Sequence, residues 1–312
     1  MKEIGGYFGL ENFSGREFYS DLIGLNSARN ALAYLIRARK IKKIYIPKYL
    51  CDSVSNVCKR EHCDVEYYDI DRTFLPVLDI TLNRNDEFIY IVNYFGQLDN
   101  ETILELNKKY KKIIVDNVQA FFQRPLENVD TIFSCRKYFG VPDGGYLSTD
   151  ACLSLERDVS KNRMKHILGR FEDDCAHVFY QDFRQSESEI DTLDLRMMSS
   201  ITKNILNAVN YEEIREKRER NFRVLLRAFE NDNPLRIKAP VGPYAFPLYI
   251  KDGQRIKKEL AKKKIYIPTL WTEAIRFGGV AKDYSENILP LPCDQRYTIE
   301  DMFRIVEEIN NV

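Results

Sequence analysis

Short apolar runs alternate with helical stretches throughout the first half of this 312-residue chain. Six runs have the length and the Ile, Val and Tyr content of buried strands: residues 43–47, 65–70, 88–94, 113–118, 131–135 and 145–149. Helical patterns fall between them, as where Ala31, Leu32, Leu35 and Ile36 share one face after Ser27. A strand–helix alternation builds a mostly parallel sheet with helices on both faces, so we predict an α/β fold.

Polar residues stand where several of these runs end. Asp116, Asn93 and Ser27 each lie at or just after the end of an apolar run or strand-like segment. In open parallel sheets, ligands bind at the carboxyl ends of the strands. We therefore expect a ligand site near these three residues.

The second half has a different character. Residues 151–196 are polar and give no clear pattern, whereas the remainder can be divided into elements. These are a helix over 198–231, an extended run over 244–250, a basic helix over 254–264, a strand at 266–268 and a last helix. Thr298 is the predicted N-cap of that last helix, with Asp301 at its third position. We predict a large α/β domain over 1–200, including an N-terminal arm over 1–20, and a small α+β domain over 201–312.

Composition excludes several classes of partner. Lys plus Arg and Asp plus Glu both number 47, so no general charge favours nucleic acid or an anionic membrane. No run approaches transmembrane length, and the first residues lack the apolar core of a signal peptide. Seven cysteines, an odd number, suit a reducing cytoplasm, where we expect the protein to reside. The spacing of Cys51, Cys58 and Cys63 does not match a zinc ribbon, and no metal is expected.

The chemistry is concentrated around Lys137 and Asp116. Asp116 closes one apolar run, and Lys137 follows the next, with Ser134 before it and the pair Gly144–Gly145 after it. Enzymes that use pyridoxal phosphate (PLP) need this combination of residues. A lysine forms the Schiff base, a carboxylate keeps the pyridine nitrogen protonated, and small hydroxyls and backbone N–H groups hold the phosphate.

The order and spacing of several motifs resemble the DegT/StrS nucleotide-sugar aminotransferases, which have the aspartate-aminotransferase fold (fold type I). Asp116 and Gln119 match an Asp followed three residues later by Gln or His, and Lys137 stands seven residues before Gly144 as the family's lysine does. Residues 26–32 resemble the phosphate turn, 92–97 the V-H-x-x-G-Q strand end and 288–292 the L-S-L-P segment. The similarity extends from about residue 20 to the C-terminus.

The resemblance implies roles around the cofactor ring. Lys137 would be the Schiff-base nucleophile, with Arg136 beside it either assisting or pointing elsewhere. Asp116 would bind the pyridinium nitrogen, and Gln119 the 3-oxygen. The alternatives are a surface lysine, an aspartate that caps the turn after its strand, and a partly exposed amide.

The resemblance also implies a phosphate site. The backbone N–H groups of Ser27 and Ala28 would face the phosphate, aided by the helix dipole. Ser27 as a plain N-cap is compatible with this role. Ser134 would be a second ligand, although it precedes the lysine by three residues where the family's serine precedes it by five.

Two positions depart from the family. Cys51 stands where an aromatic residue normally stacks on the ring, so that Tyr49 or Tyr94 would have to substitute. Asp194 replaces the asparagine that reaches the partner subunit's phosphate, and a carboxylate repels a phosphate. Either Arg196 takes over this contact or the phosphate site is altered.

The leading hypothesis is a homodimeric, PLP-dependent aminotransferase that acts on a keto sugar, nucleotide-linked, with glutamate as amino donor. Such enzymes commonly serve cell-surface polysaccharide synthesis. Sugar dehydratases of the same family replace the lysine with histidine, so Lys137 argues against them. Two alternatives remain: a vestigial PLP-binding homologue with a regulatory or scaffolding role, and an α/β ligand-binding protein without PLP.

Overall fold

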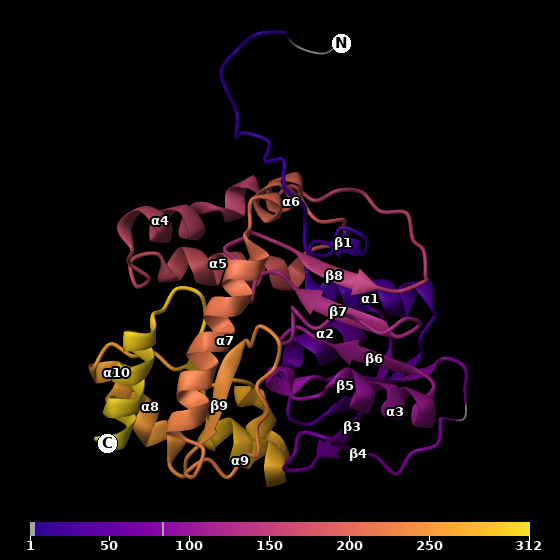
Figure 1. The fold of residues 1–312 in the computed structure, drawn as a ribbon. Helices are drawn as coiled ribbons and strands as arrows, with labels where there is room; N and C mark the ends of the chain where they lie inside the picture. The colour runs from indigo at the N-terminus through magenta and orange to yellow at the C-terminus, as the bar shows by residue number, and fades with distance from the viewer. Residues whose placement is uncertain (1–3, 83) are drawn as a thin grey trace.

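A mixed sheet forms the centre of the larger part of the molecule (Figure 1). The structure, a computed structural model, describes residues 4–82 and 84–312. Within these residues eight strands lie in the order β1-β8-β7-β6-β5-β2-β3-β4. They are β1 (Ile23–Leu25), β2 (Lys43–Pro47), β3 (Asp64–Ile70), β4 (Pro76–Val77), β5 (Glu87–Val92), β6 (Ile113–Asp116), β7 (Asp130–Ser134) and β8 (Gly145–Ser148).

The inner strands are parallel and the edges antiparallel. β3, β2, β5, β6 and β7 pair in parallel, whereas β8 and β1 on one side and β4 on the other pair antiparallel. The helices α1 (Ala28–Ala38), α2 (Asp52–Arg60) and α3 (Asn100–Tyr110) connect the first strands, and α1 packs against β7 and β8. The predicted α/β fold with a mostly parallel sheet is confirmed.

Helices fill the polar segment that gave no pattern in the sequence. α4 (Lys165–Asp173) and α5 (Tyr180–Thr192) contact each other beside the sheet. The helix predicted over 198–231 is wrong as one element: it consists of α6 (Ser200–Asn207) and α7 (Tyr211–Ala228). The break has a local cause, since the Asn210 side chain accepts the Glu213 N–H and starts a new helix.

The C-terminal part has its own small sheet and core. β9 (Ala245–Tyr249) and β10 (Ile288–Pro292) pair antiparallel, and α7, α8 (Gly253–Lys262) and α10 (Ile299–Asn310) enclose apolar residues such as Phe222, Leu260 and Met302. The predicted capping box of Thr298 and Asp301 begins α10 and is confirmed. The strand predicted at 266–268 is wrong: these residues pair with neither β9 nor β10, and Pro268 has no N–H to donate.

The remaining elements are α9 (Gly279–Asn287) and the 3₁₀ turns Tyr94–Gly96, Lys161–Arg163 and Thr272–Phe277. No helix in 4–82 and 84–312 has both the length and the apolarity needed to cross a membrane. In the same residues no group of three His, Cys, Asp or Glu side chains is placed to bind a metal ion.

Candidate active site

A cavity of about 510 Å³ lies at the carboxyl ends of β5, β6 and β7. Of the six residues predicted to form the site, it brings five together: Ser27, Ala28, Asp116, Ser134 and Lys137. The C-terminal part closes the other side with an aromatic and charged wall, which includes Tyr244, Tyr266, Trp271, Arg296 and Tyr297. The cavity therefore forms between the large sheet and the small one.

Asp116 is the last residue of β6 and is 3% exposed. Its Oδ2 accepts a hydrogen bond from the Tyr90 hydroxyl (2.7 Å), and its Oδ1 accepts one from the Val118 N–H (2.9 Å). Burial raises the pKa of the carboxyl, and the nearby Lys137 amine opposes this rise. A carboxylate in such a place gains most from a hydrogen-bonding cation, which a protonated pyridine nitrogen provides.

Lys137 lies in the tight turn after β7. The Cys135 carbonyl accepts the N–H groups of Tyr138 (3.0 Å) and Phe139 (2.9 Å) and fixes this turn. The lysine Nζ lies 5.5 Å from the centroid of the Tyr244 ring, and no hydrogen bond or ion pair of Nζ is found within the described residues. The neighbouring Arg136 points to α5, where it forms an ion pair with Glu187.

The start of α1 faces the same cavity. Ser27 caps the helix, since its Oγ accepts the Asn30 N–H (3.1 Å). Gly145 is needed here, because a Cβ at this position would stand 2.7 Å from the Ala28 nitrogen. Ser134 is 8% exposed, and its hydroxyl has no hydrogen-bond partner in the described part of the chain. The helix N-terminus and this hydroxyl together could bind a phosphate.

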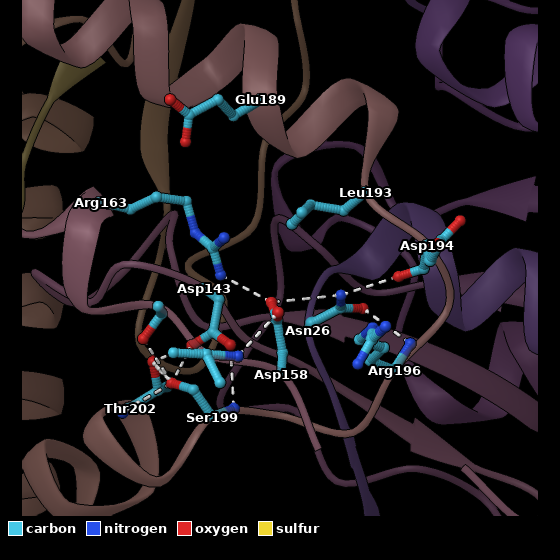
Figure 2. Close-up of polar contacts among 12 residues, drawn as sticks. Asn26, Asp143, Asp158, Arg163, Glu189, Leu193, Asp194, Arg196, Ser199 and Thr202 are labelled. Carbon is cyan, nitrogen blue, oxygen red and sulfur yellow. Dashed lines mark hydrogen bonds and ion pairs between the residues drawn. The ribbon is translucent and has the colours of Figure 1, made fainter. Parts of the chain in front are cut away.

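A buried polar network lies behind this turn (Figure 2). The Asn26 carbonyl accepts the Gly144 N–H (3.0 Å), and the Asn26 amide donates to Asp158 (3.4 Å), which is paired with Arg163 (2.6 Å). Asp143, fully buried, accepts hydrogen bonds from Ser199 and Thr202. The turn before α1 and the glycines after Lys137 are thus held by the same network.

The structure places Gln119 and Asn93 outside the cavity wall. Gln119 is 1% exposed, its Oε1 accepts the Phe95 N–H (2.9 Å), and its Nε2 has no partner within the described residues. Asn93 is used by the fold, since its side chain bonds to Leu98 and to two amide side chains, Asn117 and Gln123. Gln119 keeps one unused donor, whereas Asn93 has none to offer a ligand.

The aromatic substitutes considered for Cys51 lie in the core. The rings of Tyr49 and Tyr94 stack on each other (centroids 5.3 Å apart) and pack against Trp271. Both side chains are 1% exposed, and neither lines the cavity. Cys51 does line it, with its Sγ 2.8 Å from the Ser53 hydroxyl.

Asp194 and Arg196 also stay outside the cavity. The Asp194 carbonyl accepts hydrogen bonds from Asn26 and Asn30 (2.9 Å each), while its side chain is exposed. Arg196 forms an ion pair with Glu156 (3.1 Å). Within one chain, neither side chain contributes to the site.

The sequence did not indicate Tyr90 or the aromatic wall. Tyr90 falls within a run that predicts a buried strand, and only the parallel pairing of β5 with β6 brings its hydroxyl to Asp116. Its hydroxyl, among the apolar side chains of residues 88–92, is the signal that the sequence offers.

The sequence matches no family model and no curated protein. Solved structures share the fold. An aminotransferase described as DegT DnrJ EryC1 StrS from Brucella abortus is 14% identical, with 93% of this chain and 85% of that chain covered and a TM-score of 0.64. Ntda from Bacillus subtilis with bound cofactor PMP is 14% identical, with 93% and 72% covered and a TM-score of 0.66. PseC of Helicobacter pylori, an aminotransferase involved in pseudoaminic acid biosynthesis, is 16% identical, with 92% and 85% covered and a TM-score of 0.62.

Proposed function

We propose that this chain is a PLP-dependent aminotransferase of the DegT/StrS type. It transfers an amino group from glutamate to a keto sugar. The observation that carries the proposal is one cavity that holds Lys137, the buried Asp116 and the N-terminus of α1. Two of the solved structures that share the fold are described as aminotransferases, and a third holds the cofactor PMP.

The residues present fit pyridoxal phosphate. Asp116 would hold the pyridinium nitrogen, and the start of α1 with Ser134 would hold the phosphate. The unused Nε2 of Gln119 would be a donor for the 3-oxygen, which requires the side chain to move to the cavity. When bound, the cofactor supplies an aldehyde and an electron-withdrawing ring.

The protein's own groups perform the remaining steps. The Lys137 amine would hold the cofactor covalently, and an incoming amine would free it. The freed amine would then serve as the base and acid that moves the proton in the transfer. The buried Asp116 carboxylate would hold the ring nitrogen in its protonated form, because a carboxylate stabilises a hydrogen-bonding cation.

The wall contributed by the C-terminal part suits a sugar. Its aromatic residues, Tyr244, Tyr266, Trp271 and Tyr297, offer flat apolar surfaces, and Arg296 and Asp294 supply polar contacts. The nucleotide linkage and a role in surface polysaccharide synthesis rest on the resemblance alone. PseC, which shares the fold, is described as an aminotransferase involved in the biosynthesis of pseudoaminic acid.

We also propose a cytoplasmic homodimer. All seven cysteines are free thiols, which agrees with a reducing compartment. Large apolar side chains stay exposed on α4 and on the N-terminal arm, which supports self-association. The division into residues 1–200 and 201–312 stays a proposal, supported by the separate core around the small sheet.

The test is a spectrum of the purified protein with and without pyridoxal phosphate. We expect an absorbance band at the border of the near-ultraviolet and the visible range. Lys137→Ala should abolish this band, and Lys161→Ala, at an exposed lysine, should preserve it. Addition of glutamate should then convert the bound cofactor to the pyridoxamine form.

A second function is favoured by Cys51 and Asp194. If those departures have removed activity, the protein binds the cofactor through Lys137, yet no amino donor converts it. An absence of any retained cofactor would reject both functions and leave an α/β ligand-binding protein.

A further inference from the structure

Arg218 of α7 is a buried cation with an unusual set of partners. It is 2% exposed, and no carboxylate forms an ion pair with it among the described residues. Its Nη1 donates to the Pro243 carbonyl (2.9 Å) and its Nη2 to the Tyr138 carbonyl (3.4 Å). The nearby carboxylate of Asp294 is already bound to Arg296 through both oxygens.

The two carbonyls belong to the neighbours of two cavity residues. Tyr138 directly follows Lys137, and Pro243 directly precedes Tyr244, whose ring centroid lies 5.5 Å from the lysine Nζ. One guanidinium therefore joins the backbone that carries the lysine to the backbone that carries the ring facing it.

Two further contacts reinforce this connection. The guanidinium carbon lies 4.4 Å from the centroid of the Tyr138 ring. Gln295, which follows β10, donates from its Nε2 to the same Tyr138 carbonyl (2.7 Å). Two parts of the C-terminal half thus hold the residue next to Lys137.

A buried guanidinium is a costly way to gain stability. Removal of a cation from water without a matched anion is unfavourable, and an apolar residue of similar size would often serve the core better. Its planar fork, however, holds two carbonyls at once in a fixed plane, whereas the rotatable donors of a lysine ammonium define no such plane. Precise geometry, rather than stability, is what this arrangement supplies.

We propose that Arg218 is a positioning residue that sets the Lys137 amine relative to the Tyr244 ring. The proposal rests on the function proposed above. In the step concerned, the lysine nitrogen bonds to the aldehyde carbon of pyridoxal phosphate, and the aldehyde oxygen leaves as water. A displacement of about 1 Å in such a reaction slows it by about 100-fold.

The experiment compares Arg218→Met and Arg218→Lys with the parent protein. The readouts are the rate at which pyridoxal phosphate forms the lysine adduct, followed by absorbance, and the visible circular dichroism of the bound ring. We expect Arg218→Met to be about 100-fold slower, with the visible dichroism lost, and Arg218→Lys to be intermediate. Arg223→Met, at an exposed arginine of the same helix that pairs with Glu219, should stay within about twofold.

A double-mutant cycle with Tyr244→Leu tests the route of the effect. If Arg218 acts through the placement of that ring and the lysine, the two substitutions are coupled. The fold loss in the rate of adduct formation in the double variant is then smaller than the product of the two single fold losses. Fold losses in this rate that simply multiply in the double variant overturn the proposal. A folded Arg218→Met that has the parent's rate of adduct formation and the parent's visible dichroism overturns it too. Should Arg218→Met not fold, Gln295→Leu removes a donor to the same carbonyl and must slow the adduct by about tenfold.

The two proposals fail in different ways. A parent protein that forms no adduct at Lys137, checked by borohydride reduction and peptide mass, refutes the proposed function. A parent that forms it, together with Arg218 variants that form it equally fast, refutes only the role of Arg218.

Discussion

The Asp116 carboxylate is buried in the cavity. Among the described residues, no cation lies within hydrogen-bond distance of this carboxylate. Burial raises its pKa above the ordinary value of 3.8. The folded state therefore takes up this proton more readily than the unfolded state. The stability linked to Asp116 is present at low pH and is lost as the pH rises from about 4 through the raised folded pKa.

Asp116→Asn removes this dependence in the cofactor-free protein. We expect the free energy of unfolding of the parent, minus that of the variant, to fall as the pH rises above about 4, measured by urea denaturation. The variant also loses a charge-assisted hydrogen bond to the pyridinium worth about 1.5–3 kcal/mol, which weakens cofactor binding by about tenfold to a hundredfold.

Asp99→Asn is the control for the sign. The pKa of Asp99 is lowered by hydrogen bonds from Thr102, so its contribution changes only in more acidic solution. Between about pH 5 and pH 8, the free energy of unfolding of the parent minus that of Asp99→Asn should not change with pH. If the free energy of unfolding of the parent minus that of Asp116→Asn did not change above about pH 4, this would contradict the raised pKa of Asp116.

Single residues differ in how far the sequence could reveal them. Lys137 and Asp116 were predicted because each follows an apolar run at a spacing with a chemical meaning, and the structure places both in one cavity. Tyr90 and Arg218 were not predicted. Their partners, Asp116 and the Tyr138 carbonyl, are 26 and 80 positions away in the chain, so only the tertiary packing brings them together.

At the level of elements, the sequence was most informative for the parallel strands. The runs of β5, β6 and β7 are buried on both faces, which leaves a continuous apolar signal. β1 and β4 were not predicted because strands of three and two residues are too short to show a periodic pattern of apolar side chains. The failed strand at 266–268 has such a short apolar signal too, and Tyr266 in it is 74% exposed.

The contact between β8 and α1 depends on a glycine, and this gives a prediction at the level of elements. A Cβ at Gly145 would lie 2.7 Å from the Ala28 nitrogen and 2.9 Å from the Phe133 carbonyl oxygen. Gly145→Ala must therefore push β8 away from the start of α1. We expect a loss of about 1–3 kcal/mol in stability, together with weaker cofactor binding, measured by denaturation and by titration with pyridoxal phosphate.

Gly140→Ala is the matched control. A Cβ there would meet only Ile167, at an ordinary 3.6 Å. Its stability should remain within about 0.5 kcal/mol of the parent. Equal stability of the two alanine variants would show that β8 and α1 can separate at no cost.

At the scale of the whole molecule, one chain leaves some of its apolar surface uncovered. α4 has no buried residue, and Phe171 and Leu168 on it are 87% and 54% exposed. Residues 4–10 of the N-terminal arm extend away from the body (Figure 1), with Tyr7 and Phe8 at 99% and 95% exposure. α4 contacts α5 but buries no residue, so its exposed apolar side chains are available to a further surface.

A second copy of the chain is the cover we propose, and Phe171→Ser tests it. Sedimentation should show a dimer for the parent. Phe171→Ser removes a large apolar anchor, so the dissociation constant of the variant's dimer should be about tenfold or more higher. Phe303→Ser, at a 60% exposed position on α10, should leave the dimer unchanged. A parent that stays monomeric at high micromolar concentration would contradict the proposed dimer and leave α4 packed on α5 alone.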